Sequence, residues 1–235
     1  MQKLVHGIHT FQAHVFRAHH ELFERLVSGQ NPQALFITCS DSRMMPDLVT
    51  QSEPGDLFVL RNAGNLVPPH GAAPDSGEAA TIEYAVTALK IRDVIVCGHT
   101  LCGAMQALLH PETLADLPQM RRWLGHAEAT RQIIAANYQA IPEESRWKAA
   151  VEENVLVQLE NLRTHPCVAA GLAAGTLKLH GWVFKLEAGQ VFAYDPDQGQ
   201  FLPLGRDVPA AESGPRARLR SPDAGARPAT GRAAG

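Results

Sequence analysis

Three short apolar segments, each followed by a polar or glycine-rich turn, constrain the fold of this chain more than any other feature. They are residues 34–39, 57–60 and 94–97. Short apolar runs of this kind are typical of strands buried on both faces of a parallel sheet. Between the second and third runs a helix is expected to open at Asp75, with Glu78 as its capping partner. Strands that alternate with helices predict a parallel sheet with right-handed crossovers.

The second half of the chain is predicted to complete this sheet. Long helices are expected over about residues 119–139 and 143–163. Residues 177–184 and 190–194 flank the turn Glu187-Ala188-Gly189, a pattern typical of an antiparallel hairpin. The expected fold class is therefore α/β, with a mainly parallel central β-sheet flanked by helices and a C-terminal antiparallel hairpin.

The two ends of the chain are expected to lie outside the sheet. Residues 1–30 predict a helical arm whose apolar positions recur at steps of three and four, which places them on one face. These positions are Leu4, Ile8, Phe11, Val15, Ala18 and Leu22. Because the arm precedes the first strand and has little of its own domain to cover this face, we expect it to pack on a partner subunit. Residues 1–204 are expected to form a single domain, and residues 205–235, rich in Ala, Arg, Gly and Pro, a disordered tail.

The composition argues against two kinds of partner. The formal net charge is −3 at pH 7, so no global charge favours nucleic acid or an anionic membrane surface. No apolar stretch reaches the length of about 18 residues that a membrane-spanning helix needs. The first residues lack the apolar run of a signal peptide, so a cytoplasmic location is expected. In that reducing compartment, the four cysteines are expected to be buried, reactive or metal-bound rather than paired in disulfides.

Two cysteines and one histidine form the candidate metal site. His99 and Cys102 are three residues apart where a helix is expected to begin, so their side chains can lie on one face. Cys39 ends the first strand and His99 follows the third. If those strands are neighbours, the two residues meet at a topological switch point, where open parallel sheets bind ligands. Zinc prefers thiolate and imidazole, and three such ligands leave a fourth position for water. Core packing of Cys39 is the alternative.

Asp41 and Arg43 lie on the loop that follows Cys39 and must border this metal site. Asp41 is placed to accept a hydrogen bond from hydroxide at the metal. The planar, always charged guanidinium of Arg43 is placed to grip Asp41 through two bonds and keep it ionised. The alternative is an Asp–Arg pair that only braces the loop.

Several motifs, taken together, resemble one known family. They are Cys39-Ser40-Asp41-Ser42-Arg43, Arg61-Asn62-Ala63-Gly64-Asn65, Gly98-His99-Thr100-Leu101-Cys102-Gly103-Ala104, His180-Gly181-Trp182-Val183 and Ala193-Tyr194-Asp195. These segments resemble the signatures and C-terminal strands of β-class carbonic anhydrases. The resemblance covers about residues 1–204. It is greatest to the plant and cyanobacterial branch, in particular to the carboxysomal cyanobacterial form.

The resemblance implies a lyase that reversibly hydrates carbon dioxide to bicarbonate and a proton, with hydroxide formed at zinc as the nucleophile. It implies one Zn²⁺ per chain, held by Cys39, His99 and Cys102. It also implies that Asp41 turns to Arg43 in an active form and occupies the metal in a closed form. Two alternatives stay open: hydrolysis of carbon disulfide or carbonyl sulfide on the same fold, and a non-catalytic scaffold stabilised by zinc.

Five further residues gain a role only through this resemblance. Gln30 matches a glutamine that orients substrate from the neighbouring subunit, which implies a homodimer or a higher homo-oligomer. Phe58, Ala63 and Tyr84 match the lining of an apolar carbon dioxide pocket, with core packing as the alternative for the two aromatic residues. The backbone of Gly103 matches a group that holds bicarbonate. The arginine-rich tail differs from the extension of the carboxysomal form, so the location is left between cytoplasm and carboxysome.

Overall fold

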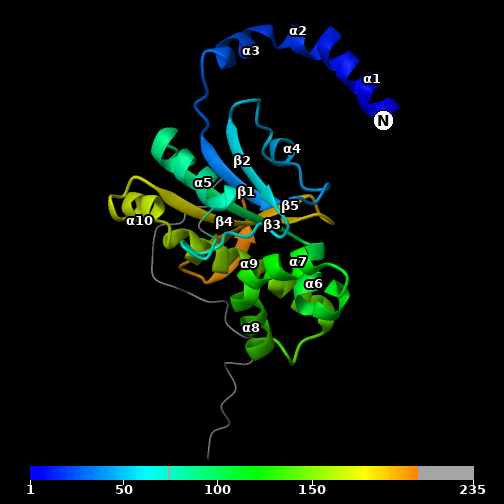
Figure 1. Cartoon of the computed structure of the whole chain (residues 1–235), viewed down its shortest axis with the longest axis vertical. Helices are drawn as coiled ribbons and strands as arrows, with labels where there is room; N and C mark the ends of the chain where they lie inside the picture. Colours follow the sequence, from blue (N-terminus) through cyan, green and yellow to red (C-terminus); the bar gives the residue numbers. More distant parts are fainter. Residues whose placement is uncertain (74, 206–235) are drawn as a thin grey trace, which may run out of the picture.

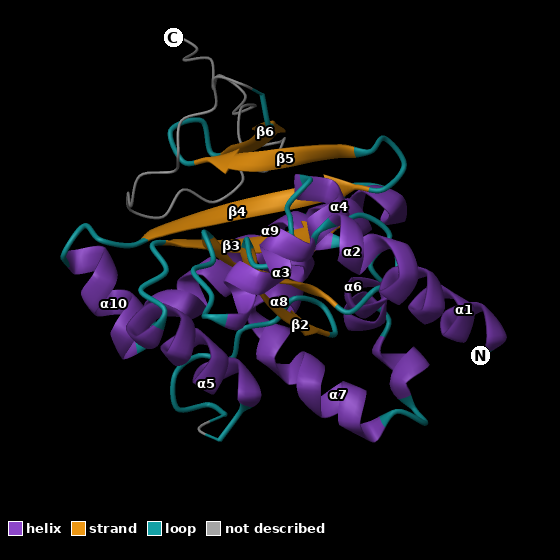
Figure 2. Ribbon diagram, turned by 90° about the horizontal axis from the view of Figure 1, so that it is seen from above, coloured by secondary structure: helices purple, strands orange, loops and turns teal. Residues whose placement is uncertain are grey.

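A computed structural model describes residues 1–73 and 75–205 of the 235-residue chain. Its centre is a six-stranded sheet with the strand order β2-β1-β3-β4-β5-β6 (Figure 1). The strands are β1 (Ala34–Cys39), β2 (Leu57–Asn62), β3 (Asp93–His99), β4 (Lys178–Lys185), β5 (Gln190–Asp195) and β6 (Gln200–Pro203). Strands β1 to β4 pair in parallel, whereas β4, β5 and β6 pair antiparallel. The mainly parallel sheet with its C-terminal hairpin is confirmed, and β6 adds an edge strand that was not predicted (Figure 2).

The helices follow the expected alternation with the strands, but their ends differ from the prediction. The α-helices are α1 (Gln2–Thr10), α2 (Phe16–Ala18), α3 (His20–Val27), α4 (Pro46–Thr50), α5 (Gly77–Glu83), α6 (Gly103–Leu109), α7 (Pro118–Leu124), α8 (Glu128–Asn137), α9 (Glu143–Arg163) and α10 (Pro166–Ala173). Short π-helical turns cover Phe11–Val15 and Tyr84–Ala88, and 3₁₀ turns cover Pro111–Leu114 and Gly125–Ala127. The long helix expected over residues 143–163 is confirmed, and α10 was not predicted.

Two helix predictions are wrong in detail. The helix expected over residues 119–139 is divided into α7 and α8, because a 3₁₀ turn begins at Gly125, whose backbone freedom weakens a helix. Asp75 does not cap α5. The N-cap is Ser76, whose hydroxyl accepts a hydrogen bond from the backbone N–H of Ala79 at 3.2 Å. A serine hydroxyl serves this purpose as well as a carboxylate does, so the spacing alone could not choose between the two residues.

Helix α9 covers the face of the sheet that forms the larger part of the core. It packs on β3 and β4, and β1 contributes Leu35 and Ile37, which are fully buried on the same side. At Gly98 of β3, an added Cβ would lie 2.9 Å from Val155 Cγ2 of α9. The absence of a side chain at Gly98 therefore lets α9 approach the strand that ends in His99, and this contact fixes one wall of the site.

The opposite face of the sheet carries a smaller apolar cluster. Its buried members are Ala34, Phe36, Met44, Ile95 and Cys97. Phe36 packs edge-on against Trp182 of β4, with ring centroids 6.0 Å apart. Because both faces of β1 are covered, all six of its residues are buried, as the continuous apolar run predicted.

The N-terminal arm projects away from the sheet and carries no buried residue (Figure 1). It is not one continuous helix, because the backbone leaves the helical region at His19, where φ is −110° and ψ is 22°. Its exposed large apolar side chains are Met1, Leu4, Val5, Ile8, Phe11, Val15, Phe16 and Val27. Packing of this face on a partner subunit stays a prediction. No helix in the described part of the chain is long and apolar enough to span a bilayer. The predicted tail, residue 205 apart, lies outside the described residues.

Candidate active site

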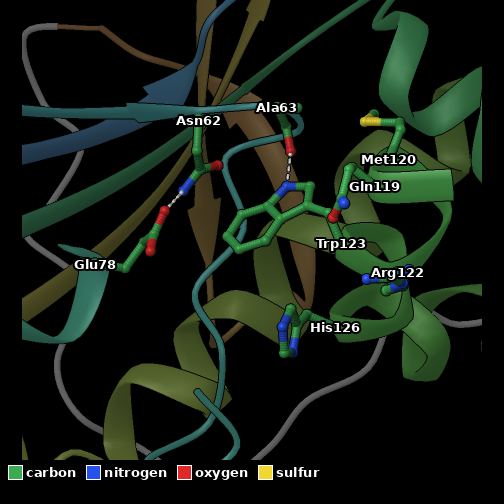
Figure 3. A pocket seen from close by; sticks show the side chains of 8 residues that line it. All are labelled: Asn62, Ala63, Glu78, Gln119, Met120, Arg122, Trp123 and His126. Atoms are coloured by element: carbon green, nitrogen blue, oxygen red, sulfur yellow. Dashed lines mark hydrogen bonds between the residues drawn. The ribbon is translucent and has the colours of Figure 1, made fainter. Parts of the chain in front are cut away.

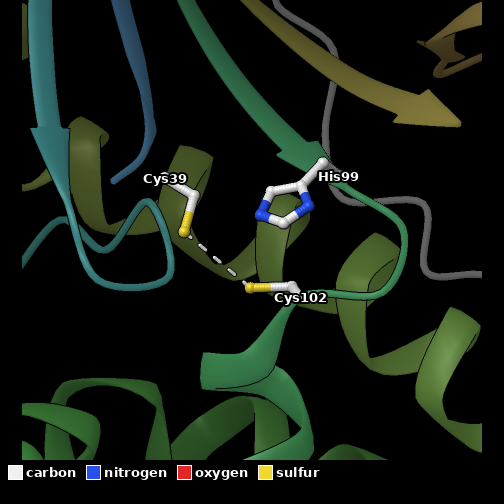
Figure 4. A group of neighbouring side chains, drawn as sticks. All are labelled: Cys39, His99 and Cys102. Carbon is white, nitrogen blue, oxygen red and sulfur yellow. Dashed lines mark hydrogen bonds between the residues drawn. The ribbon is translucent and has the colours of Figure 1, made fainter. Parts of the chain in front are cut away.

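The chain order of the sheet brings Cys39, His99 and Cys102 together at one edge. The chain passes from β1 to β2 on one side and returns to β3 on the other side of β1. The carboxyl ends of β1 and β3 are therefore neighbours at a switch point, as predicted. Cys39 is the last residue of β1, His99 the last of β3, and Cys102 the N-cap of α6 (Figure 4).

The three side chains present a donor set that fits a zinc ion. Their ligand atoms all lie within 4.8 Å of one another, and all three residues are buried. The sulfur atoms of Cys39 and Cys102 are 4.0 Å apart. Two thiolates on a tetrahedral zinc, each about 2.3 Å from the metal, would be about 3.8 Å apart, so little movement is needed. His99 Nε2 is buried and has no hydrogen-bond partner among the described residues, which a metal bond would correct.

The tautomer of His99 is set by its neighbour Thr100. His99 Nδ1 lies 2.9 Å from the carbonyl oxygen of Thr100. A carbonyl oxygen only accepts, so Nδ1 carries the proton and Nε2 keeps its lone pair. Nε2 is the nitrogen that faces the two sulfur atoms (Figure 4). A donor bond from the second ring nitrogen is the usual arrangement of a metal-binding histidine.

The two thiols of the site differ in acidity. The pKa of Cys39 is lowered, chiefly because the Cys102 thiol donates to its sulfur, with further donation from the backbone N–H of Gly64. The pKa of Cys102 is raised by that same shared hydrogen bond and by burial. The protein groups thus favour one thiolate, and the charge of a bound dication favours the second. Cys97 belongs to the cluster on the other face of the sheet, and burial raises its pKa to about 12.

Asp41 borders the metal position but is turned away from it by Arg43. Arg43 Nε donates to Asp41 Oδ1 at 2.9 Å, and Arg43 Nη2 donates to Asp41 Oδ2 at 2.7 Å. The backbone N–H of Arg43 adds a third bond to Oδ1. These bonds hold the pKa of Asp41 well below its usual range. Asp41 Oδ2 still lies 3.9 Å from His99 Nε2, so the carboxylate stands at the edge of the open fourth position.

Two residues for which the sequence predicted no role hold the loops that carry the site. Arg61 of β2 donates to three carbonyl oxygens of the loop that follows β1. The acceptors are Cys39, Asp41 and Met44, at 3.0, 2.9 and 2.8 Å. Trp147 of α9 donates from Nε1 to the carbonyl oxygen of Cys102 at 3.0 Å. Arg61 belongs to a motif that the sequence had already singled out, whereas nothing in the sequence links Trp147 to Cys102.

The residues expected to line a carbon dioxide pocket lie around β2 and the segment after it. The rings of Phe58 and Tyr84 form a pair with centroids 6.0 Å apart. Phe58 packs on the main core, whereas Tyr84 is 50% exposed in the single chain. Core packing therefore explains part of the contacts of the Phe58 side chain. It does not explain the presence of an aromatic side chain at Tyr84, because that side chain is half exposed.

Ala63 forms the boundary between the sheet and a neighbouring pocket of about 580 Å³ (Figure 3). The lining residues are Asn62, Ala63, Glu78, Gln119, Met120, Arg122, Trp123 and His126. Trp123 Nε1 donates to the carbonyl oxygen of Ala63 at 2.7 Å. Helix α7 thus holds the backbone of Ala63 in place from the side opposite to the sheet.

Gly103 and Gln30 occupy different surroundings. Gly103 is the first residue of α6, directly after Cys102, and a Cβ added there would meet no atom within 4 Å. Space is therefore open beside its backbone. Gln30 lies exposed on the segment between α3 and β1, and the described part of this chain shows no contact from it to the three ligands. A role for Gln30 of a partner subunit at this site stays a prediction.

The family is decided by a match over most of the sheet. A family model for carbonic anhydrase matches residues 34–191, a span that contains all three candidate metal ligands. The chain belongs to the carbonic anhydrase family. It is 51% identical over 196 residues to a carbonic anhydrase of Synechocystis, an alignment that covers 83% of this chain and 71% of that relative. It is 48% identical over 204 residues to a carbonic anhydrase of Pseudomonas aeruginosa, covering 87% of this chain and 92% of that one.

Solved structures assign this carbonic anhydrase to the β class. The β-carbonic anhydrase CcaA superposes with a TM-score of 0.87 at 48% identity, covering 90% of this chain and 95% of CcaA. The Coccomyxa β-carbonic anhydrase in complex with acetazolamide gives a TM-score of 0.73 at 31% identity, covering 85% and 91% of the two chains. The resemblance found in the motifs is confirmed. The enzyme is a zinc-dependent β-carbonic anhydrase that reversibly hydrates carbon dioxide to bicarbonate.

Proposed function

We propose that Cys39, His99 and Cys102 hold the zinc ion of this carbonic anhydrase and that Asp41 and Arg43 act beside it. One observation carries the proposal: His99 Nε2, buried and unpartnered within the described residues, faces the two sulfur atoms while Arg43 holds Asp41 away. Structural zinc sites have four protein ligands, whereas this arrangement offers three. The geometry therefore favours a catalytic site over the zinc-stabilised scaffold.

Zinc held by these three residues would supply Lewis acidity, which makes hydroxide available near neutral pH. Asp41 lies at the edge of the ligand cluster, with Oδ2 3.9 Å from His99 Nε2, where its carboxylate would accept a hydrogen bond from the nucleophile and orient it. Arg43 keeps Asp41 ionised, because its two parallel bonds to the carboxylate are charge-assisted. A protonated Asp41 would be a weaker acceptor and would present an O–H donor instead.

The apolar residues near β2 receive carbon dioxide. Phe58 and Tyr84 provide ring faces and Ala63 a small side chain, and these apolar surfaces suit a small linear apolar molecule. The open space beside the Gly103 backbone accommodates the oxygen atoms of bicarbonate as they form. Gln30 of the partner subunit donates to the substrate and orients it.

The role of Gln30 requires at least a homodimer. The arm exposes an apolar face formed by residues such as Leu4, Ile8 and Phe11. Such a face supports packing of the arm against a second copy of this chain. A β-carbonic anhydrase of Sordaria macrospora, 29% identical to this chain, is described as tetrameric. Sedimentation velocity of the zinc-loaded protein should show species of two or more chains. Full turnover by a stable single chain would rule out a catalytic Gln30 from a partner.

Metal removal tests the assignment of the site. Dialysis against a strong chelator should abolish carbon dioxide hydration, because protein side chains supply no Lewis acid and the described residues contain no second cluster that could hold a metal ion. One equivalent of Zn²⁺ per chain should restore turnover in proportion to the zinc bound, measured by stopped-flow hydration and elemental analysis. Activity that survives in protein shown to be free of metal would defeat the proposal.

A further inference from the structure

The two residues between His99 and Cys102 are held by a hydrogen-bonded contact from the far end of the chain. Thr100 is buried, and its hydroxyl donates to Glu187 Oε2 at 2.5 Å. The same hydroxyl accepts the backbone N–H of Leu186 at 2.9 Å. The direction of both bonds is certain, because an N–H can only donate and an ionised carboxylate can only accept. The turn of the β4–β5 hairpin is thereby fastened to the loop that carries the metal ligands.

Thr100 transmits this contact to the ring of His99. Its backbone N–H donates to the carbonyl oxygen of Phe184 at 3.0 Å, which extends the pairing of β3 with β4 by one residue. Its own carbonyl oxygen accepts from His99 Nδ1 at 2.9 Å. The peptide plane that orients the imidazole is therefore held through both the side chain and the backbone of one residue.

The backbone of Leu101 shows why the segment between His99 and Cys102 needs stabilising contacts from other parts of the chain. Leu101 has φ at +58°, in the left-handed region that a residue with a branched side chain rarely adopts. Its carbonyl oxygen accepts from Arg43 Nη2 at 3.0 Å. Glu187 on one side and Arg43 on the other thus hold a strained turn in the shape that presents Nε2 to the two sulfur atoms.

Glu187 itself has no evident part in forming the hairpin. It is exposed, and the turn takes its sharp shape at Gly189, whose φ is +63°. We propose that Glu187 is a positioning residue of this carbonic anhydrase, which acts through Thr100 to fix the ring of His99. The inference rests on the proposed function, since it assigns His99 as a ligand. The hydrogen bond of the Glu187 side chain goes to Thr100 and not to a metal ligand, so its effect on His99 is indirect.

Variants of the two partners test this role in the zinc-loaded enzyme. Glu187→Ala should lower zinc affinity and kcat by about tenfold each, at the lower end of what the loss of a hydrogen bond behind a metal ligand costs. The cobalt-substituted variant should show an altered visible spectrum, because a loosened imidazole changes the ligand field. Glu187→Gln keeps an oxygen acceptor for Thr100 and should recover most of both losses. Gln190→Ala, on the same hairpin, is the matched control and should change neither property.

A double variant separates this route from simple destabilisation. Thr100→Val should reproduce the effects of Glu187→Ala, and combining the two should lose no more than Thr100→Val alone. The positioning role of Glu187 is overturned if Glu187→Ala keeps the wild-type cobalt spectrum and zinc affinity. It is also overturned if the fold-losses of the two single variants multiply in the double variant. A failure of the proposed function would look different: the wild-type enzyme would lack turnover, while the cobalt spectrum and zinc affinity would still report on Glu187.

Discussion

Replacing Cys102 by alanine should abolish carbon dioxide hydration and release the zinc ion. The variant leaves only Cys39 and His99 as protein ligands, and it removes one of the two thiolates that neutralise the metal. We expect activity to fall by well over about 100-fold, because even groups behind the ligands cost about 10–100-fold when removed. Zinc per chain, measured by elemental analysis after dialysis, should fall in parallel with turnover.

Cys97→Ala is the matched control for this variant. Cys97 lies two residues before His99 and is as deeply buried as Cys102, but it belongs to the cluster on the other face of the sheet. It should keep one zinc per chain and near wild-type turnover, at a small cost in stability from the lost side-chain volume. Wild-type activity in Cys102→Ala, or loss of zinc from Cys97→Ala, would show that the ligand set is wrong.

Replacing Arg43 by alanine should lower turnover by a different route, with the zinc ion retained. The carboxylate of Asp41 would lose both side-chain hydrogen bonds from Arg43. Because Asp41 Oδ2 is already only 3.9 Å from His99 Nε2, the freed carboxylate is placed to take the fourth position and exclude water. We expect kcat to fall by about 10–100-fold, with zinc content unchanged. X-ray absorption at the zinc edge should detect an added oxygen ligand at full occupancy.

Two companion variants sharpen this prediction. Arg43→Lys keeps the charge but not the planar pair of donors, so it should be impaired nearly as much as the alanine variant. Asp41→Asn removes the charge that competes for zinc, so it should lower turnover without adding a carboxylate ligand. If Arg43→Ala were fully active, or lost its zinc, Asp41 would not be controlled in the way the hydrogen bonds suggest.

The sequence predicted the parts of this protein that depend on local pattern. The continuous apolar run of residues 34–39 predicted a strand buried on both faces, and β1 is buried throughout. Strands alternating with helices predicted the parallel sheet, and the switch point between β1 and β3 predicted that Cys39 and His99 would meet. Each of these inferences needed only residue spacing and general rules for parallel sheets.

The parts that were missed depend on contacts between distant segments. Thr100 and Glu187 are separated by 87 positions in the chain, and Trp147 reaches Cys102 from a helix whose register no local pattern reveals. The edge strand β6 is short and weakly apolar, so it carries no strong strand pattern. The roles of Gln30, Phe58 and Tyr84 rested on family resemblance, and like the cytoplasmic or carboxysomal location they stay predictions.

Stopped-flow measurement of carbon dioxide hydration across pH, with zinc quantified in the same sample, decides whether this site is catalytic. We predict turnover proportional to bound zinc that rises with pH, because hydroxide is the attacking species. One zinc ion per chain without turnover at any pH would contradict the assignment. The three ligands would then serve a closed or structural site.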